Sequence, residues 1–304
     1  MSEKNQQHKS KIGGQALIEG IMMNGVKKGA MACRLPNGEI DVEIWEKKPV
    51  TAWYRKTPLI RGIFNFVISM KDGYSCLMKS AEKQMDDDEA EEDEKLSDKA
   101  MNAIMGVVMV LSLVIAVGLF VFLPKWIVNF ADVLTVNRFV RSLAEGIIKI
   151  IIFIGYLAAT ALMKDVKRTY EYHGAEHKTI ACFEAGLEPT VENVKKQVRF
   201  HPRCGTSFIF ITLIISILVM CLVPFTVVWQ RVLSSVILLP LMVGISYELI
   251  RIAGRYENIF TKILSAPGLY IQRLTTKEPD DKEIECAIAA IKPCIPDNLE
   301  EDKW

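Results

Sequence analysis

The most regular feature of the chain is a series of long apolar stretches after residue 100. The first runs from Met101 to Leu123 without a charged residue, and Pro124 follows it. About 20 apolar residues in a helix are enough to cross the hydrocarbon core of a bilayer. Three further stretches have similar length and composition, and they cover residues 143–163, 207–229 and 232–250. The pattern therefore predicts a mostly α-helical, polytopic membrane protein with four transmembrane helices.

The four predicted spans differ in how they are connected. We expect Pro124 to end the first span and the apolar residues after it, 126–128 and 133–136, to lie along the membrane surface. Only Gln230 and Arg231 separate the third and fourth spans, which should therefore form a tight antiparallel pair. Glu145 and Lys149 stand four residues apart in the second span, so they lie on one helix face and would neutralise each other.

Lysine and arginine residues indicate the orientation of the spans. Eight of them lie between the second and third spans, three between the first and second, and one between the third and fourth. Positively charged residues collect in the cytoplasmic loops of membrane proteins. The central segment, residues 164–206, and both termini are therefore expected to face the cytoplasm.

Residues 1–84 are predicted to form a small cytoplasmic β unit followed by an amphipathic helix. Alternating segments at 30–35 and 39–45 flank Pro36-Asn37-Gly38, and Asn-Gly in such a place is a strong hairpin signal. Upstream, the glycines of segment 13–20 suit tight turns, but their spacing is not that of a phosphate-binding loop. Thr57 and Pro58 then begin a helix whose apolar face should pack on the β unit. Residues 85–100, which are rich in carboxylates, are predicted to be an acidic linker.

The last part of the chain, residues 251–304, is predicted to be a cytoplasmic helical region. The helix of the fourth span should continue to Leu264 and break at Ser265–Gly268, which contains Pro267. A last helix should begin near Pro279–Asp281. The acidic tail from residue 293 to residue 304 is expected to be loose.

Composition narrows the class of protein further. Half of the residues are apolar, the mean hydropathy is +0.21, and 37 Lys and Arg against 36 Asp and Glu leave a net charge of +1. Such a chain is too apolar to be disordered and too neutral to hold nucleic acid by bulk charge. No secretory signal peptide is expected near the start. Seven cysteines without a C-x-x-C pair do not indicate a disulfide framework. Six of them lie outside the apolar stretches, and those regions are therefore expected to face a reducing compartment.

Three of the four histidines fall in the central segment together with a glutamate and a cysteine. The strings are Tyr172-His173-Gly174-Ala175-Glu176-His177-Lys178 and His201-Pro202-Arg203-Cys204-Gly205. Histidines four residues apart lie on one face of a helix, so both imidazoles can bind one ion. The H-x-x-E-H spacing of His173, Glu176 and His177 is one in which two histidines bind zinc and the glutamate activates water. His201 and Cys204 would complete the ligand set.

Two alternatives to a catalytic metal site remain open. The H-x-x-E-H spacing also arises by chance, and Gly174 costs a helix about 1 kcal/mol relative to alanine; the residues could then be buried polar groups satisfied by their neighbours. The clustering nevertheless favours a divalent metal ion, and mixed imidazole and thiolate ligands favour zinc. If all four ligands bind, no coordination position stays open and Glu176 becomes a supporting residue rather than the catalytic base. Further candidates for substrate binding or support of the site are Gln15, Glu19, Arg203 and Glu248.

Five motifs, in order along the chain, resemble a bacterial family of uncharacterised membrane proteins, the YqhQ-like family. They are GGQALIEGIMM, YHGAEHK, HPRCGTSF, GISYELIR and PGLYIQRLTTKEPDD. The resemblance covers nearly the whole chain apart from both termini and the acidic linker. The family has been described as predicted metal-dependent enzymes. The resemblance thus implies a protein of the bacterial cytoplasmic (inner) membrane with a metal site, and it names no substrate.

These observations lead to two functional hypotheses. In the first, the protein is a metal-dependent hydrolase at the cytoplasmic membrane surface, with Glu176 as the catalytic base. In the second, it is a non-enzymatic membrane scaffold or membrane-protein biogenesis factor in which zinc locks the central segment onto the β unit. Both require the lipid bilayer as a partner and exclude nucleic acid, and the second adds a membrane-protein partner. The sequence predicts neither the substrate nor the oligomeric state.

Overall fold

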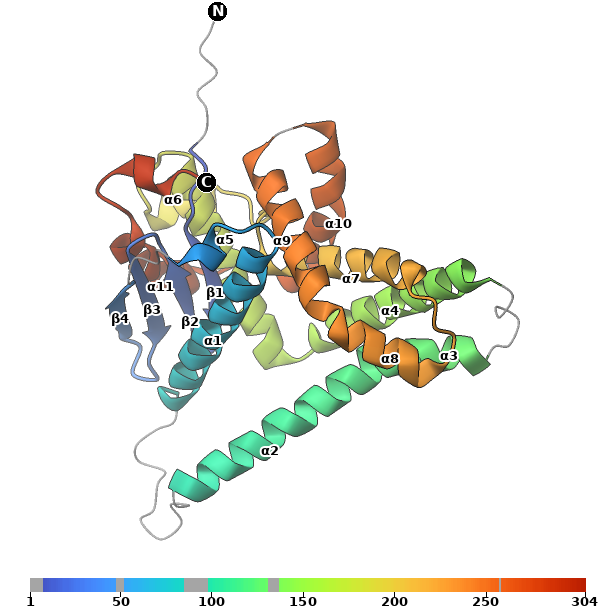
Figure 1. Ribbon diagram of the computed structural model, residues 1–304. Helices are drawn as coiled ribbons and strands as arrows, with labels where there is room; N and C mark the ends of the chain where they lie inside the picture. Colours follow the sequence, from blue (N-terminus) through green and yellow to red (C-terminus); the bar gives the residue numbers. More distant parts are fainter. Residues whose placement is uncertain (1–7, 48–51, 85–97, 131–136, 257) are drawn as a thin grey trace, which may run out of the picture.

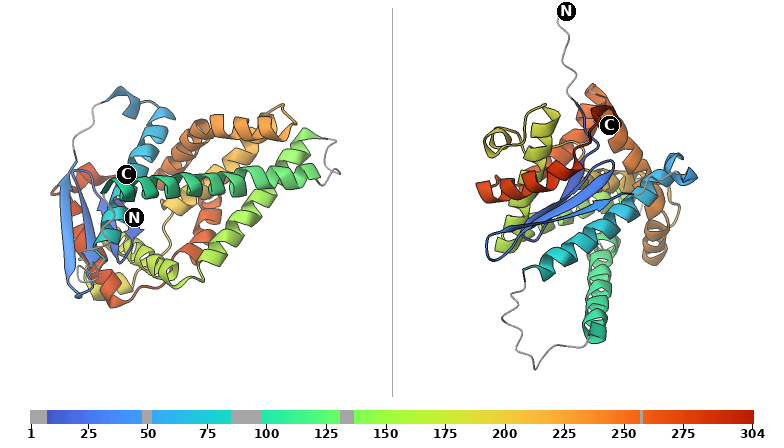
Figure 2. Two further views of the ribbon diagram at one scale, coloured as in Figure 1. Left: turned by 90° about the horizontal axis from the view of Figure 1, so that it is seen from below. Right: turned by 90° about the vertical axis from the view of Figure 1, so that its left-hand side faces the viewer.

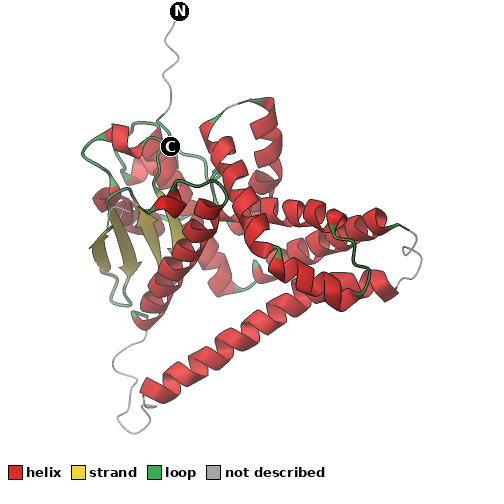
Figure 3. Cartoon of the chain, in the orientation of Figure 1, coloured by secondary structure: helices red, strands yellow, loops and turns green. Residues whose placement is uncertain are grey.

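The structure, a computed structural model, describes residues 8–47, 52–84, 98–130, 137–256 and 258–304. The protein is mostly helical and has one four-stranded sheet near its N-terminus (Figures 1 and 3). The strands are β1 (Gly13–Leu17), β2 (Gly20–Asn24), β3 (Lys28–Arg34) and β4 (Ile40–Glu46). The first helices are α1 (Ile60–Glu82), α2 (Asp98–Val117), α3 (Leu123–Phe130), α4 (Arg138–Thr160), α5 (Lys164–Glu184) and α6 (Val191–Lys195). The later helices are α7 (Gly205–Leu222), α8 (Val228–Ile237), α9 (Leu239–Arg255), α10 (Ile259–Thr275) and α11 (Asp281–Ile291).

The sheet is antiparallel with its strands in sequence order, and helices pack against both of its faces. The predicted hairpin is confirmed as β3 and β4, whereas the glycine-bracketed segment proves to be a strand and a turn in a second hairpin, β1–β2. Because side chains alternate along a strand, Ile21 and Met23 face α5 and α11, and Leu17 and Met22 face Cys76 of α1. The expected packing of the first helix on the β unit is thus observed, and the right-hand view of Figure 2 shows the sheet between these layers.

The first apolar stretch is longer than predicted. A π-helical turn, Gly118–Phe122, joins α2 to α3, and the helix passes through Pro124 to Phe130. The prediction that Pro124 ends the span was wrong because the amide of Leu123 bonds to the carbonyl of Gly118, and the wider turn accommodates the proline without breaking the helix. Residues 126–128 are consequently helical rather than a surface loop. The predicted surface segment 133–136 and most of the acidic linker, residues 85–97, lie outside the described residues.

The predicted turn between the third and fourth apolar stretches was placed incorrectly. The chain turns at residues 223–227, where Pro224 cannot continue α7, and Arg231 lies inside α8. Helices α8 and α9 then bend by 50° at their junction. Among the described residues, three helices are long and apolar enough to cross a membrane, or four if this bent pair is one span.

The C-terminal region departs from the prediction in two places. The helix does not break at Ser265–Gly268; it ends at Arg255, and α10 starts with a capping box of Asn258 and Thr261 and continues through Pro267, which removes only one helix hydrogen bond. The tail is also ordered, because Asp302 is fully buried and accepts a hydrogen bond from the amide of Lys11 at 3.0 Å. By contrast, α11 begins where expected, after Asp280, which caps it.

Candidate metal site

The centre of α5 lies where the sheet layer meets the bundle of apolar helices. Strand β1 passes over this part of α5, and α7 begins beside it. In this region the ligand atoms of His173, His177 and Cys204 all lie within 4.8 Å of one another. His177 is 1% exposed and Cys204 is 7% exposed. The structure therefore brings together two imidazoles four residues apart on one helix with a thiol that follows 27 residues after the second of them.

Each of the two histidines is oriented by a backbone carbonyl. Nδ1 of His173 lies 2.8 Å from the carbonyl oxygen of Thr275, and Nδ1 of His177 lies 2.6 Å from that of Arg199. A carbonyl oxygen can only accept, so both Nδ1 atoms carry the proton and both Nε2 atoms are left as ligands. Nε2 of His173 accordingly lies 3.2 Å from Sγ of Cys204.

Cys204 is held in place by its position at the start of α7. It is the N-cap residue, and its sulfur accepts from the amide of Thr206 at 3.5 Å. The loop before it is fixed by Gln272 of α10, whose side chain bonds both the amide and the carbonyl of His201, at 2.8 and 2.7 Å. The end of α10 and the start of α7 thus set the location of the thiol.

The charges of the group are coupled. Burial alone would raise the pKa of the Cys204 thiol, but the imidazoles of His173 and His177 hold that pKa well below its usual value. Burial likewise opposes protonation of His173, and the adjacent Cys204 raises the pKa of its imidazole to about 9. Each of these two groups therefore favours the charged form of the other. The thiolate form of a cysteine is the one that binds metal.

Glu176 points into the same region and is 5% exposed. Strand β1 lies directly against it, since a Cβ added at Gly14 would be 3.0 Å from the carboxyl carbon of Glu176. Its Oε2 has no hydrogen-bond partner among the described residues, and burial raises the pKa of its carboxyl although the two histidines act in the opposite direction. Two imidazoles and a thiolate are a donor set that suits zinc, and the unpartnered carboxylate oxygen lies near them.

His201 lies beside this group, but its Nε2 is directed at Glu184 and Arg203. Its ring centroid is 5.7 Å from that of His177, while its Nε2 is 3.5 Å from a carboxylate oxygen of Glu184 and 3.2 Å from Nη2 of Arg203. Glu184 also forms an ion pair with Arg203. Glu184 stands outside the motifs of the sequence, although it follows His177 by seven residues and so lies on the same helix face.

Three other candidate residues lie away from the metal-ligand group. Gln15 is on the opposite face of β1 from Gly14, and a Cβ at Gly73 of α1 would be 2.0 Å from its Oε1. Glu19 forms an ion pair with Arg168 and accepts from the hydroxyl of Tyr172 at 3.2 Å. Glu248 pairs with Arg61 of α1 and accepts from the amide of Leu59. Gln15 packs against α1, and Glu19 and Glu248 form ion pairs with arginines of other elements.

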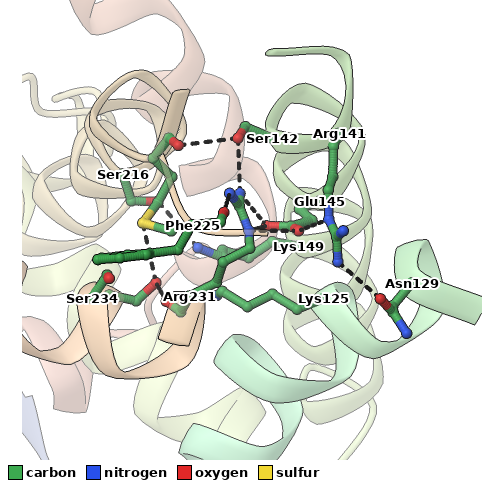
Figure 4. A network of polar contacts seen from close by, with 12 residues as sticks. Lys125, Asn129, Arg141, Ser142, Glu145, Lys149, Ser216, Phe225, Arg231 and Ser234 are labelled. Carbon is green, nitrogen blue, oxygen red and sulfur yellow. Dashed lines mark hydrogen bonds and ion pairs between the residues drawn. The ribbon is translucent and has the colours of Figure 1, made fainter. Parts of the chain in front are cut away.

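A second polar group, of which the sequence indicated only Glu145 and Lys149, is buried among the apolar helices at the end away from the sheet. This buried charge cluster consists of Lys125, Arg141, Glu145, Lys149 and Arg231 (Figure 4). Glu145 accepts from Arg231 at 2.8 and 2.9 Å and from Arg141 at 3.2 Å. No direct ion pair joins Glu145 and Lys149 among the described residues. Lys149 donates to Oγ of Ser216 at 3.2 Å, and Lys125 donates to the carbonyl of Val121 at 3.0 Å.

Comparison with known proteins identifies a family. Residues 57–297 match the model of a family described as "Protein of unknown function (DUF1385)". The chain is also 36% identical over 291 residues to "Uncharacterized protein YqhQ" of Bacillus subtilis (strain 168), which covers 93% of this chain and 92% of the relative. No solved structure matches. With a family model that spans most of its length and a relative of this identity, the chain belongs to the DUF1385 family.

Proposed function

We propose that the protein is a metal-dependent hydrolase of the cytoplasmic membrane, with a zinc site on its cytoplasmic side. The observation that supports this best is the carboxylate of Glu176, which is buried beside three metal-ligating atoms and has one oxygen without a partner. A buried carboxylate is costly unless it has a proton to accept or a charge to face. A general base needs such a carboxylate oxygen that is free to accept a proton.

The roles of the residues follow from their contacts. His173, His177 and Cys204 would hold the ion, and the carbonyls of Thr275 and Arg199 keep the two imidazoles in the ligating tautomer. When bound, zinc acts as a Lewis acid and makes water a better nucleophile at neutral pH. Glu176 would act as the base that accepts a proton at its unpartnered Oε2. Arg203 is not assigned to the substrate, because Glu184 and the ring of Trp304 already occupy its guanidinium.

The membrane placement is part of the same proposal. It is supported by three or four helices of sufficient length and apolarity, and by the excess of lysine and arginine between the second and third of them. Under the positive-inside rule, the sheet, α5 and α11 face the cytoplasm. The metal site then lies close to the cytoplasmic ends of α4 and α7, at the level of the membrane surface.

Substitution of single site residues tests the assignment. Zinc content is measured on the purified full-length protein, and hydrolysis is followed with carboxylic ester, phosphoester and peptide substrates. Glu176→Gln is expected to keep zinc and to lower turnover by about 10²–10⁴-fold, the range for a general base. Cys204→Ala is expected to weaken zinc binding by more than the ~10–100-fold cost of losing a supporting hydrogen bond.

Glu171→Gln is the matched control, because Glu171 lies on the same helix and pairs with Lys167 instead of facing the site. It should leave both zinc content and turnover unchanged. Cobalt substitution gives a readout that does not depend on activity: the thiolate-to-cobalt absorption should vanish in Cys204→Ala and persist in Glu176→Gln. Absence of bound metal in the wild-type protein, or full turnover in Glu176→Gln, would refute the assignment.

One observation favours the scaffold as a second candidate function. The ligands come from α5 and the start of α7, the carbonyl that orients His173 comes from the end of α10, and His177 and Cys204 are buried. An ion at such a junction would hold the elements together, as structural zinc does. Chelation followed by thermal melting separates the two roles: collapse of the fold supports a structural ion, and a folded apoprotein supports the hydrolase.

A further inference from the structure

The buried charge cluster carries more positive than negative charge. Its four cationic side chains are at most 9% exposed. Within the described part of the chain, Glu145 is the one carboxylate that pairs with any of them, and it pairs with the two arginines. If both lysines are neutral, Arg141 and Arg231 against Glu145 still leave one excess positive charge, because a guanidinium does not lose its proton. Excess charge in an apolar interior is unfavourable. The cluster therefore favours an anion supplied from outside the chain.

A cavity of about 730 Å³ lies beside this cluster. Arg141 belongs to both: its Nε donates to Glu145 and its Nη2 donates to Oδ1 of Asn129 at 3.1 Å. Its Nη1 has no hydrogen-bond partner among the described residues. A guanidinium donor is thus left for a ligand in the cavity, and the amide nitrogen of Asn129 can add a second donor.

The rest of the cavity wall is aromatic and apolar. Phe122, Trp126 and Trp229 line it, and they are 46%, 50% and 64% exposed. Tryptophan is enriched at the level of lipid headgroups, where its ring contacts both the apolar and the polar layer. These residues stand on α3, on the turn before it and on α8, at the end of the helices away from the sheet (Figure 1).

We infer that this cavity binds the phosphate headgroup of an anionic membrane lipid. Arg141 and Asn129 hold the phosphate, and Trp126 and Trp229 contact the apolar part next to it. The excess positive charge of the cluster selects a lipid with a net negative headgroup over a zwitterionic one. This inference rests on the proposed membrane insertion of the apolar helices and is independent of the metal site.

The test compares three probes on the purified full-length protein in a neutral detergent. Phosphatidylglycerol, phosphatidylcholine and inorganic phosphate are titrated, and binding is followed by native mass spectrometry and by the melting temperature. Phosphatidylglycerol should bind and raise the melting temperature of the protein. Phosphatidylcholine and inorganic phosphate should bind at least tenfold more weakly. Arg141→Gln should weaken phosphatidylglycerol binding by about tenfold or more, as expected for a lost charged hydrogen bond.

Two further variants guard against a simple folding defect. Trp229→Ala removes part of the cavity wall without touching an ion pair and should also weaken phosphatidylglycerol binding. Arg255→Gln, at the exposed far end of α9, removes an arginine elsewhere and should leave binding unchanged. Equal binding of the two lipids, equal effects of inorganic phosphate, or unchanged binding in both Arg141→Gln and Trp229→Ala would overturn the inference. Release of the protein from membranes by alkaline carbonate would overturn the membrane placement itself. None of these outcomes bears on the metal site, which zinc content tests separately.

Discussion

Replacing Glu145 with glutamine is expected to lower the free energy of unfolding by about 3–5 kcal/mol, the cost of breaking a buried ion pair by removing one partner. Glutamine keeps the size of the side chain but not its charge. The guanidiniums of Arg231 and Arg141, which are 0% and 6% exposed, would then share the interior without a carboxylate. Denaturant or thermal unfolding in detergent micelles, followed by circular dichroism, measures the loss.

The matched control for Glu145→Gln is Glu248→Gln. Glu248 also pairs with an arginine, Arg61, but the two side chains are 20% and 18% exposed, so water can replace the lost partner. Pairs of this kind contribute about 0–1 kcal/mol. A double variant, Glu145→Gln with Arg231→Met, should recover part of the stability because it removes the uncompensated charge. Equal losses in the two single variants would contradict a buried ion pair at Glu145.

Replacing Gly174 with alanine is expected to destabilise the protein by about 1–3 kcal/mol, the usual cost of overpacking. A Cβ at this position would lie 1.9 Å from the carbonyl oxygen of Lys277, so either α5 or the segment after α10 must move. That segment is held to α5, since the amide of Lys277 donates to the carbonyl of Tyr170 at 2.8 Å. The carbonyl of Thr275, which orients His173, lies two residues before Lys277, so zinc affinity should fall by about 10–100-fold as well.

Gly155→Ala in α4 is the control for Gly174→Ala. No atom lies within 4 Å of a Cβ added there, so the helix propensity of alanine should raise the stability by up to about 1 kcal/mol. The two substitutions are chemically identical and both are in helices, yet they should change the melting temperature in opposite directions. A stabilised Gly174→Ala protein would show that the close approach of α5 and Lys277 is not tight.

Gly174 also illustrates how far local sequence rules extend. Its low helix propensity counted against a helix at the H-x-x-E-H spacing, but α5 is continuous there. The backbone of residue 277 needs the space that a side chain would fill, and this contact joins residues about a hundred positions apart. Propensity describes the cost of glycine to the isolated helix; packing accounts for why glycine is nevertheless present.

Local patterns along the chain were sufficient for the elements whose signal comes from neighbouring residues. These include the apolar helices, the β3–β4 hairpin with its Asn-Gly turn, the start of α11 at Asp280, and the spacing of His173 and His177 on one helix face. Each depends on a local signal, namely the length of an apolar stretch, the spacing of side chains, a turn or a helix cap. These local signals do not depend on where in the protein the segment packs.

Contacts between distant segments were decided only by the tertiary structure. Arg231 was assigned to a turn and instead reaches Glu145, 86 residues away, because the chain turns earlier, at residues 223–227. His201 directs its nitrogen at Glu184, whereas Cys204 meets His173, because Gln272 fixes the loop between them. Gly14 of β1 covers Glu176 from a position 162 residues earlier in the sequence. Such pairings depend on the directions in which helices and strands pack, and those directions are set by the whole core.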